Sequence, residues 1–211
     1  MSKWGKSTVE KSGNLEKYES KNPLKQRMIH NFQQTLIQEL RENVPGLKQG
    51  EKLTLCDVGC GEGIIDRTLL NTFPTLDITG FDLSERAIAF AKELNPEAQY
   101  YVKNILDADS TDKYDVVLCT EVLEHLPDPA RAINVLKQMT ARVCVITVPH
   151  EPFFCLGNLL SLKNVTRLGN PKDHINHWTF RSFKKEMEKN GRGGGKFFYS
   201  FPWQGYFLFQ G

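Results

Sequence analysis

Residues 53–63, with the sequence LTLCDVGCGEG, decide the fold of this chain. The first six residues are a short apolar run that ends at Val58, which is typical of a buried strand. The glycines that follow allow a sharp turn and a close approach of a ligand to the backbone. A helix is predicted from Ile64 to Thr72, and its first N–H groups would point toward that ligand. The stretch therefore predicts a strand–turn–helix unit with a binding site at the turn.

A regular alternation of strands and helices surrounds this unit. An amphipathic helix is predicted from Pro23 to near Asn43, because apolar residues recur there every three or four positions. Further elements follow in turn, with strands at residues 77–81, 99–102, 114–119 and 142–148 and helices at residues 85–94 and 129–139. Such an alternation predicts an α/β fold, a doubly wound parallel sheet with helices on both faces.

The two ends of the chain and residues 150–178 lie outside this alternation. Residues 1–21 are polar and lack an apolar period, so they are predicted to be a mobile tail, and residues 22–211 to be a single domain. Residues 150–178 break the alternation, and this long stretch is expected to be a loop insertion that covers a site as a substrate lid. The chain is predicted to end with a helix at residues 179–190 and an antiparallel pair of strands at residues 196–201 and 205–209.

Composition excludes several classes of protein. The chain has 211 residues, 40% of them hydrophobic and 25% charged, which is ordinary for one folded domain. No apolar run approaches the roughly 20 residues of a membrane-spanning helix. The polar amino-terminal stretch lacks the apolar region of a secretory signal, so a cytoplasmic location is expected. The five cysteines show no paired CxxC spacing and are expected to be reduced.

Charge distinguishes two possible ligands of the glycine turn. Asp57 and Glu62 lie at the turn, and Asp82 ends the second strand about 20 residues later, the spacing at which a carboxylate reaches ribose hydroxyls. Carboxylates repel the pyrophosphate of a dinucleotide, whereas they attract the sulfonium and α-amino groups of S-adenosylmethionine. The turn therefore favours S-adenosylmethionine over a nicotinamide dinucleotide.

Four segments in order resemble the successive motifs of the Rossmann-like S-adenosylmethionine-dependent methyltransferases. They are DVGCGEG at residues 57–63, FDLSERAI at 81–88, YDVVLCTEVLEHLPDP at 114–129 and VCVITVP at 143–149. Within the third segment, EVLEH is similar to a motif of the ubiquinone-biosynthesis O-methyltransferases. The resemblance implies a seven-stranded, mostly parallel sheet whose last strand is antiparallel.

The resemblance also implies a set of donor-binding residues: Asp57, Gly59, Gly61, Gly63, Asp82, Leu83, Asn104, Thr120 and Glu121. The glycines would line the methionine part of the donor, and Thr120 and Glu121 would lie beside its methyl group. Asp82 would hold the ribose hydroxyls, with Leu83 against the adenine. Asn104 stands where the family often has an aspartate that accepts the adenine amino group, and its amide oxygen can also accept a hydrogen bond.

The EVLEH stretch leaves three interpretations open. Glu121, Glu124 and His125 have the spacing of one face of a helical turn, and His174 and His177 follow in the later loop. In one interpretation Glu124, His125 or His177 is a general base that takes a proton from the acceptor. In another, Glu121, Glu124, His125 and His174 hold a divalent metal ion. In the third, these side chains only shape the pocket.

The sequence therefore predicts an S-adenosylmethionine-dependent methyltransferase that acts on a small molecule, at oxygen. The apolar segment PFFCLGNLLSL at residues 152–162 and the basic carboxy-terminal part suit an acceptor that is partly apolar or anionic. No nucleic-acid partner is favoured, because no long basic stripe interleaved with aromatic residues is present. The alternatives are a metal-assisted RNA 3′-terminal 2′-O-methyltransferase, a non-catalytic cofactor-binding regulatory protein and a nicotinamide-dependent reductase.

Overall fold

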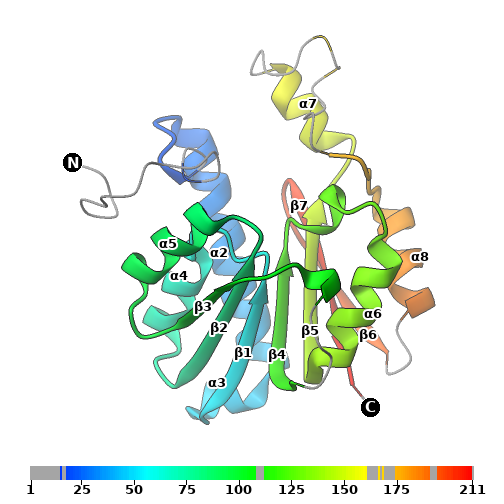
Figure 1. Cartoon of the computed structure of the whole chain (residues 1–211). Helices are drawn as coiled ribbons and strands as arrows, with labels where there is room; N and C mark the ends of the chain where they lie inside the picture. The colour runs from blue at the N-terminus through cyan, green and yellow to red at the C-terminus, as the bar shows by residue number, and fades with distance from the viewer. Residues whose placement is uncertain are drawn as a thin grey trace.

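One seven-stranded sheet runs through the computed structural model (Figure 1). The structure describes residues 15, 18–107, 112–160, 166, 168, 174–190 and 194–210. The strands are β1 (Leu53–Val58), β2 (Leu76–Asp82), β3 (Gln99–Val102), β4 (Tyr114–Thr120), β5 (Thr140–Pro149), β6 (Gly195–Ser200) and β7 (Trp203–Phe209). Their order in the sheet is β3-β2-β1-β4-β5-β7-β6, and β7 is antiparallel to both of its neighbours. The predicted mixed sheet is confirmed.

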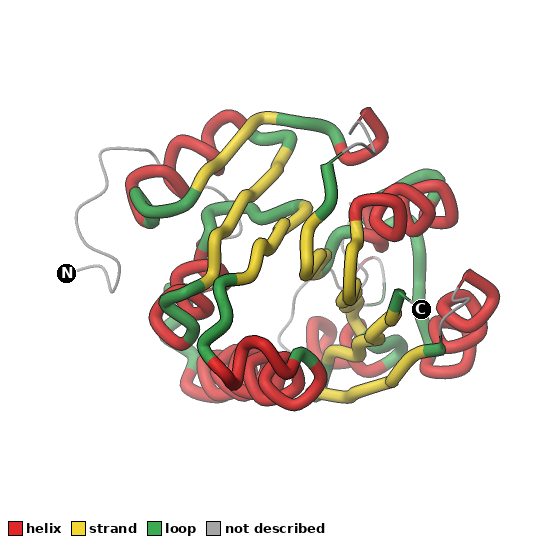
Figure 2. The backbone as a smooth tube through the Cα atoms, turned by 90° about the horizontal axis from the view of Figure 1, so that it is seen from below, coloured by secondary structure: helices red, strands yellow, loops and turns green. Residues whose placement is uncertain are grey.

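Helices cover both faces of the sheet, as the view from below shows (Figure 2). The helices are α2 (Pro23–Asn43), α3 (Pro45–Gln49), α4 (Ile64–Thr72), α5 (Glu85–Leu94), α6 (Pro129–Met139), α7 (Phe153–Leu160) and α8 (Phe180–Asn190), and the short 3-10 turns are η1 (Ile105–Asp107) and η2 (Leu123–His125). Helix α4 contacts α2 and α5 on one side of the sheet, and α6 contacts α8 on the other. Among the described helices, none has both the length and the apolar content needed to cross a membrane.

The core follows the alternation of side chains along the strands. Leu53 and Leu55 of β1 belong to the cluster that α2 and α4 complete, whereas Cys56 and Val58 belong to the cluster under α6 and α8. Successive strand residues point to opposite faces, so a strand buried on both sides reads as one apolar run. The same alternation places Asp57 on the α4 side of the sheet, which fixes the position of its carboxyl group.

Most predicted helices and strands are confirmed within two residues at each end, but two helices were missed. Pro45 starts the short helix α3 directly after α2, where no further helix was predicted. Helix α7 forms where residues 150–178 were expected to be a loop, and it projects beyond the carboxyl ends of the strands (Figure 1). Residues 161–165, 167 and 169–173 lie outside the described residues, so the role of this insertion as a lid stays a prediction.

The amino-terminal residues that the structure describes pack against the domain. Leu15 is 1% exposed and contacts Ile64 of α4 and Phe90 of α5. Tyr18 packs against the same cluster, and the Glu19 N–H donates to the Leu15 carbonyl at 3.0 Å. These two apolar side chains anchor the described residues 15 and 18 to the domain, and the mobile tail over residues 1–21 stays a prediction. Residues 1–14 and 16–17 lie outside the described part of the chain.

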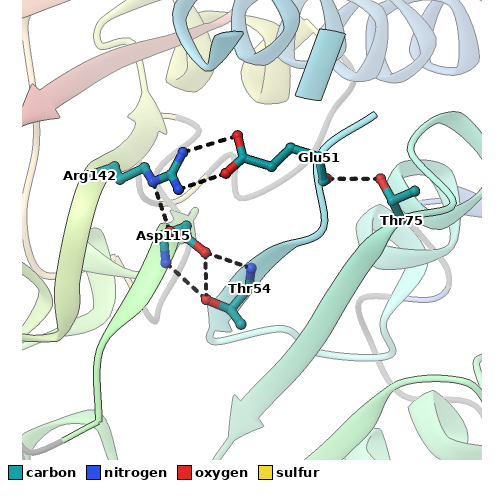
Figure 3. Close-up of polar contacts among 5 residues, drawn as sticks. All are labelled: Glu51, Thr54, Thr75, Asp115 and Arg142. Atoms are coloured by element: carbon teal, nitrogen blue, oxygen red, sulfur yellow. Dashed lines mark hydrogen bonds and ion pairs between the residues drawn. The ribbon is translucent and has the colours of Figure 1, made fainter. Parts of the chain in front are cut away.

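A polar network joins three strands at the amino edge of the sheet (Figure 3). The Arg142 guanidinium of β5 contacts the carboxylates of Glu51 and Asp115, with its shortest distance to each carboxylate at 2.8 Å. Asp115 of β4 also accepts hydrogen bonds from the Thr54 N–H at 2.9 Å and the Thr54 hydroxyl at 3.0 Å. The Thr75 hydroxyl donates to the Glu51 carbonyl at 3.1 Å. These contacts hold β1, β4 and β5 together at the edge opposite the glycine turn.

We expect Asp115→Ala to lower the free energy of unfolding by about 1–3 kcal/mol, because it leaves partly buried Thr54 donors without their acceptor. Urea unfolding of the variant and the wild type measures the difference. Asp112→Ala, two positions before β4 and exposed, is the matched control and should change stability by less than about 0.5 kcal/mol. Equal stability of the Asp115 variant and the wild type would contradict the role given to this network.

Candidate active site

The glycine turn lies at the carboxyl edge of β1 and is tied to β2. Gly59, Gly61 and Gly63 have φ values of 78°, 54° and 67°, a region that other residues rarely adopt. The Gly59 N–H donates to the Phe81 carbonyl at 2.7 Å. A Cβ atom at Gly59 would lie 2.3 Å from Cγ2 of Val122, just before η2. The glycines are therefore required by geometry, and the turn brings the ends of β1, β2 and β4 together.

Asp82, the last residue of β2, contacts this turn. Its Oδ2 accepts a hydrogen bond from the Gly61 N–H at 2.9 Å, and its Oδ1 accepts one from the Ser84 N–H at 2.8 Å. Leu83 follows it with 65% of its surface exposed, which places an apolar face beside the turn. Asn104, after β3, uses its Oδ1 to accept the Leu106 N–H at 3.0 Å. A carboxylate, an apolar side chain and an amide thus follow the ends of neighbouring strands.

Two buried carboxyl groups lie beneath the turn. Asp57 of β1 is 1% exposed and Asp66 of α4 is 0% exposed. The two groups interact with each other in the interior, and both oxygens of Asp57 and Oδ1 of Asp66 accept no hydrogen bond from the described residues. Tyr100 donates to Asp66 Oδ2 at 2.9 Å, and the Asn95 amide links Tyr100 to the Gly63 carbonyl, both at 2.8 Å. Burial, followed by repulsion between the two groups, raises the pKa of Asp57 well above its usual range, and burial raises the pKa of Asp66.

Because these pKa values are raised, the folded chain binds more protons than the unfolded chain above about pH 4. The pair therefore contributes most to stability at low pH, and this contribution is lost as pH rises through the raised pKa values. In Asp66→Asn, the amide keeps an acceptor for Tyr100 and gains a donor for Asp57. We expect the fall in unfolding free energy between about pH 5 and pH 8 to shrink by about 1 kcal/mol or more.

Urea unfolding at several pH values measures this difference. The exposed Asp112→Asn is the control, and its stability should follow that of the wild type across the whole range. Parallel pH curves for Asp66→Asn and the wild type would contradict the raised pKa values of the two carboxyl groups.

The amino-terminal turn covers this acidic cluster. The Tyr18 hydroxyl is buried, and burial together with the nearby carboxylates of Glu121, Asp57 and Glu62 raises its pKa. Glu62 is itself buried and accepts a hydrogen bond from the Leu15 N–H. The sequence did not predict that Leu15 and Tyr18 cover the acidic cluster, since the only pattern there is two apolar residues three positions apart in a polar stretch.

At the end of β4, the backbone turns sharply. Glu121 has a φ of 56°, and its N–H donates to the Thr147 carbonyl of β5 at 3.0 Å. A left-handed conformation costs a residue other than glycine about 1–3 kcal/mol and is often found at functional sites. The predicted helical face that included Glu121 is wrong, because the helical turn starts only at Leu123. Glu124, which is buried, and His125, which is not, belong to this turn, η2.

Asn176 fastens the later segment, residues 174–178, onto η2. Its side-chain amide donates to the carbonyls of Leu123, at 3.0 Å, and Leu126, at 2.6 Å. The backbone N–H groups of Ile175 and Asn176 donate to the Glu124 carbonyl at 2.9 and 3.0 Å. Four hydrogen bonds therefore fix the position of this segment beside the end of β4.

These four hydrogen bonds place His174 beside His125. The two rings have centroids 4.9 Å apart in an edge-to-face arrangement, and Phe154 of α7 stacks on His174 at 5.4 Å. Ligand atoms of Glu124, His125 and His174 lie within 4.8 Å of one another. Three of the four residues of the predicted metal set therefore meet, while Glu121 does not belong to this group. The cluster has the composition of either a general base with its partners or a site for a divalent ion.

The structure places His177 in a different cluster. Its Nδ1 lies 3.8 Å from Oε1 of Glu151, and Cys155 completes a group whose ligand atoms are within 4.8 Å of one another. His177 is therefore not grouped with His125, and its role as a general base stays a prediction. Glu151 was not singled out in the sequence, because its contact with His177 depends on how residues 150–178 fold.

Comparison with known proteins identifies the family. A model described as a methyltransferase domain matches residues 28–191. The chain belongs to the S-adenosylmethionine-dependent methyltransferases. A ubiquinone biosynthesis O-methyltransferase of Aeromonas salmonicida is 34% identical over 135 residues, which cover 60% of this chain and 56% of the relative. One of Nitrosomonas europaea is 35% identical over 113 residues, covering 50% and 46%. The chain spans about half the length of these curated relatives.

Solved methyltransferase structures share the fold. Magnesium protoporphyrin IX methyltransferase of Synechocystis, solved with bound SAH, aligns with a TM-score of 0.65 at 19% identity and covers 90% of this chain and 88% of that chain. A small RNA methyltransferase aligns with the same TM-score at 23% identity and covers 82% of this chain and 25% of that enzyme. At these identities the likeness supports the fold alone. The resemblance seen in the sequence is confirmed.

Proposed function

We propose that this chain transfers a methyl group from S-adenosylmethionine to an oxygen atom of a small-molecule acceptor. The observation that carries the proposal is the buried acidic cluster of Asp57, Asp66 and Glu62 under a glycine turn. Such a site favours a ligand with positive charge, and S-adenosylmethionine supplies a sulfonium that carries an activated methyl group. The choice of oxygen rests on the O-methyltransferase relatives. The cytoplasmic location expected from the sequence stays a prediction.

In this proposal the donor lies across the carboxyl ends of the strands. Gly59, Gly61 and Gly63 leave room for its methionine part, and Asp57 supplies negative charge below it. Asp82 accepts hydrogen bonds from the ribose hydroxyls. Hydrogen bonds to its charged carboxylate are stronger than hydrogen bonds to a neutral acceptor. The remaining contacts would come from residues that follow β2, β3 and β4, namely Leu83 and Asn104 at the adenine and Thr120 and Glu121 beside the methyl group.

His125 is the general base in this proposal. The acceptor oxygen forms a bond with the methyl carbon as the bond between sulfur and carbon breaks, and the acceptor proton passes to His125. Glu124 and His174 position the imidazole. Holding the two reactants in line and excluding water supply most of the acceleration.

A second candidate follows from the same cluster. Glu124, His125 and His174 offer a carboxylate and two imidazoles within 4.8 Å, which also suits a divalent ion that orients the acceptor. This is the arrangement that a metal-assisted RNA 2′-O-methyltransferase would require. A chelator separates the two candidates, because only the metal-dependent reaction is lost in its presence and restored by a divalent ion.

Donor binding is tested by calorimetry with S-adenosylhomocysteine. We expect binding to the wild type and a loss of about tenfold or more in Asp82→Asn, because the amide keeps the shape of the carboxylate but lacks its charge. Asp112→Asn is the matched control on the surface. Binding of a nicotinamide dinucleotide in place of S-adenosylhomocysteine would overturn the proposal.

Methyl transfer is tested with labelled donor and a metabolite extract, followed by identification of the labelled product. We expect His125→Ala to lower turnover about 10²–10⁴-fold, the usual contribution of a general base, while S-adenosylhomocysteine affinity stays unchanged. His30→Ala, an exposed histidine on α2, is the control. Unchanged turnover in His125→Ala would show that His125 is not the general base. Donor binding without any labelled product would favour a regulatory protein.

A further inference from the structure

A second cluster of metal-ligand types lies at the start of α7, outside the donor and base sites described above. Glu151 follows the end of β5, Cys155 lies in the first turn of α7, and His177 belongs to the segment before α8. One ligand atom from each residue lies within 4.8 Å of the other two. Three side chains from two separate stretches of chain, residues 151–155 and 174–178, therefore come together.

Glu151 is the most informative member. Its side chain is buried, with only 7% of the residue exposed. Oε2 accepts a hydrogen bond from the Cys155 N–H at 3.2 Å, and the Glu151 N–H donates to the Trp178 carbonyl at 2.9 Å. Oε1 is buried and accepts no hydrogen bond from the described residues. A buried carboxylate oxygen without a donor is costly, and a cation at this point would remove the cost.

The distances suit a small ion. Oε1 lies 3.8 Å from Nδ1 of His177, which is too long for a hydrogen bond. In a tetrahedral zinc site with bonds of about 2.0–2.1 Å to nitrogen and oxygen, two neighbouring ligand atoms lie about 3.3 Å apart. A movement of about half an ångström would therefore bring these two ligand atoms to the spacing of a tetrahedral site. The His177 side chain is 43% exposed and has room for this movement.

We propose that Glu151, Cys155 and His177 bind a zinc ion. The donor set of one carboxylate oxygen, one thiolate and one imidazole is typical of zinc. On binding, the Cys155 thiol loses its proton to solvent as the zinc–sulfur bond forms, and the two anionic ligands neutralise the ion. Three protein ligands leave a fourth position for water or for an oxygen of the acceptor.

The proposed ion has a structural consequence. It joins the start of α7 to residues 174–178, the segment that carries His174 to His125. The cluster of Glu124, His125 and His174 contains no sulfur, so a thiolate ligand distinguishes the two sites in an experiment. Zinc binding is measured without methyl transfer, so failure of this proposal and failure of the proposed function are separable.

The test uses the full chain after removal of metal with a chelator. Cobalt(II) serves as a spectroscopic probe, because a thiolate ligand gives a sulfur-to-cobalt charge-transfer band, and competition with a colorimetric chelator gives the zinc affinity. We expect one zinc ion per chain and a loss of affinity of at least about tenfold in Cys155→Ser, Glu151→Gln and His177→Ala. Cys155→Ser should also lose the band, while His125→Ala and His30→Ala should keep it.

Two results overturn the proposal. One is zinc affinity in His177→Ala and Cys155→Ser equal to that of the wild type, and the other is a charge-transfer band that persists in Cys155→Ser. Circular dichroism and urea unfolding check that each variant is folded. If Cys155→Ser does not fold, His177→Ala decides the outcome, because its half-exposed side chain is replaced without opening the core.

Discussion

The close approach of two carboxyl groups in the interior is the constraint on which the site depends. Asp57 and Asp66 are both buried, and their repulsion and lost hydration disfavour two negative charges. A protein that needed only a tight turn would gain stability by replacing either residue with an apolar one. The acidic pair is therefore explained best by a positively charged ligand, because attraction to such a ligand offsets the hydration energy that the carboxylates lose on burial.

The fold separates the stabilising polar contacts from this costly cluster. At the amino edge of the sheet, Arg142 forms an ion pair with Asp115, and Asp115 accepts a hydrogen bond from the Thr54 N–H. These contacts join neighbouring strands. At the carboxyl edge, Asp57 and Asp66 face groups of like charge, and Glu121 holds a left-handed backbone. Strain is concentrated where ligands bind in open α/β sheets, and the opposite edge carries the stabilising network.

The sequence predicted what depends on local pattern and missed what depends on long-range contact. Strand and helix bounds followed from the period of apolar residues, and the glycine turn followed from residues that are adjacent in the chain. Leu15 and Tyr18 were missed, since their burial depends on α4 and α5. The conformation of Glu121 was also missed, because it is fixed by a hydrogen bond to β5. Glu151 had no local signal, since His177 meets it only through the fold.

Residues 174–178 connect the two histidine clusters. Asn176 holds the segment to η2, and the Trp178 carbonyl accepts hydrogen bonds from the Glu151 N–H and from the Gln204 side chain of β7. His174 and His177 are three residues apart on this fixed segment, yet they reach different clusters. A displacement of the segment would therefore alter the proposed base and the proposed zinc site together. The proposed acceptor site is consequently organised by one short segment, whereas the proposed donor site is built into the sheet itself.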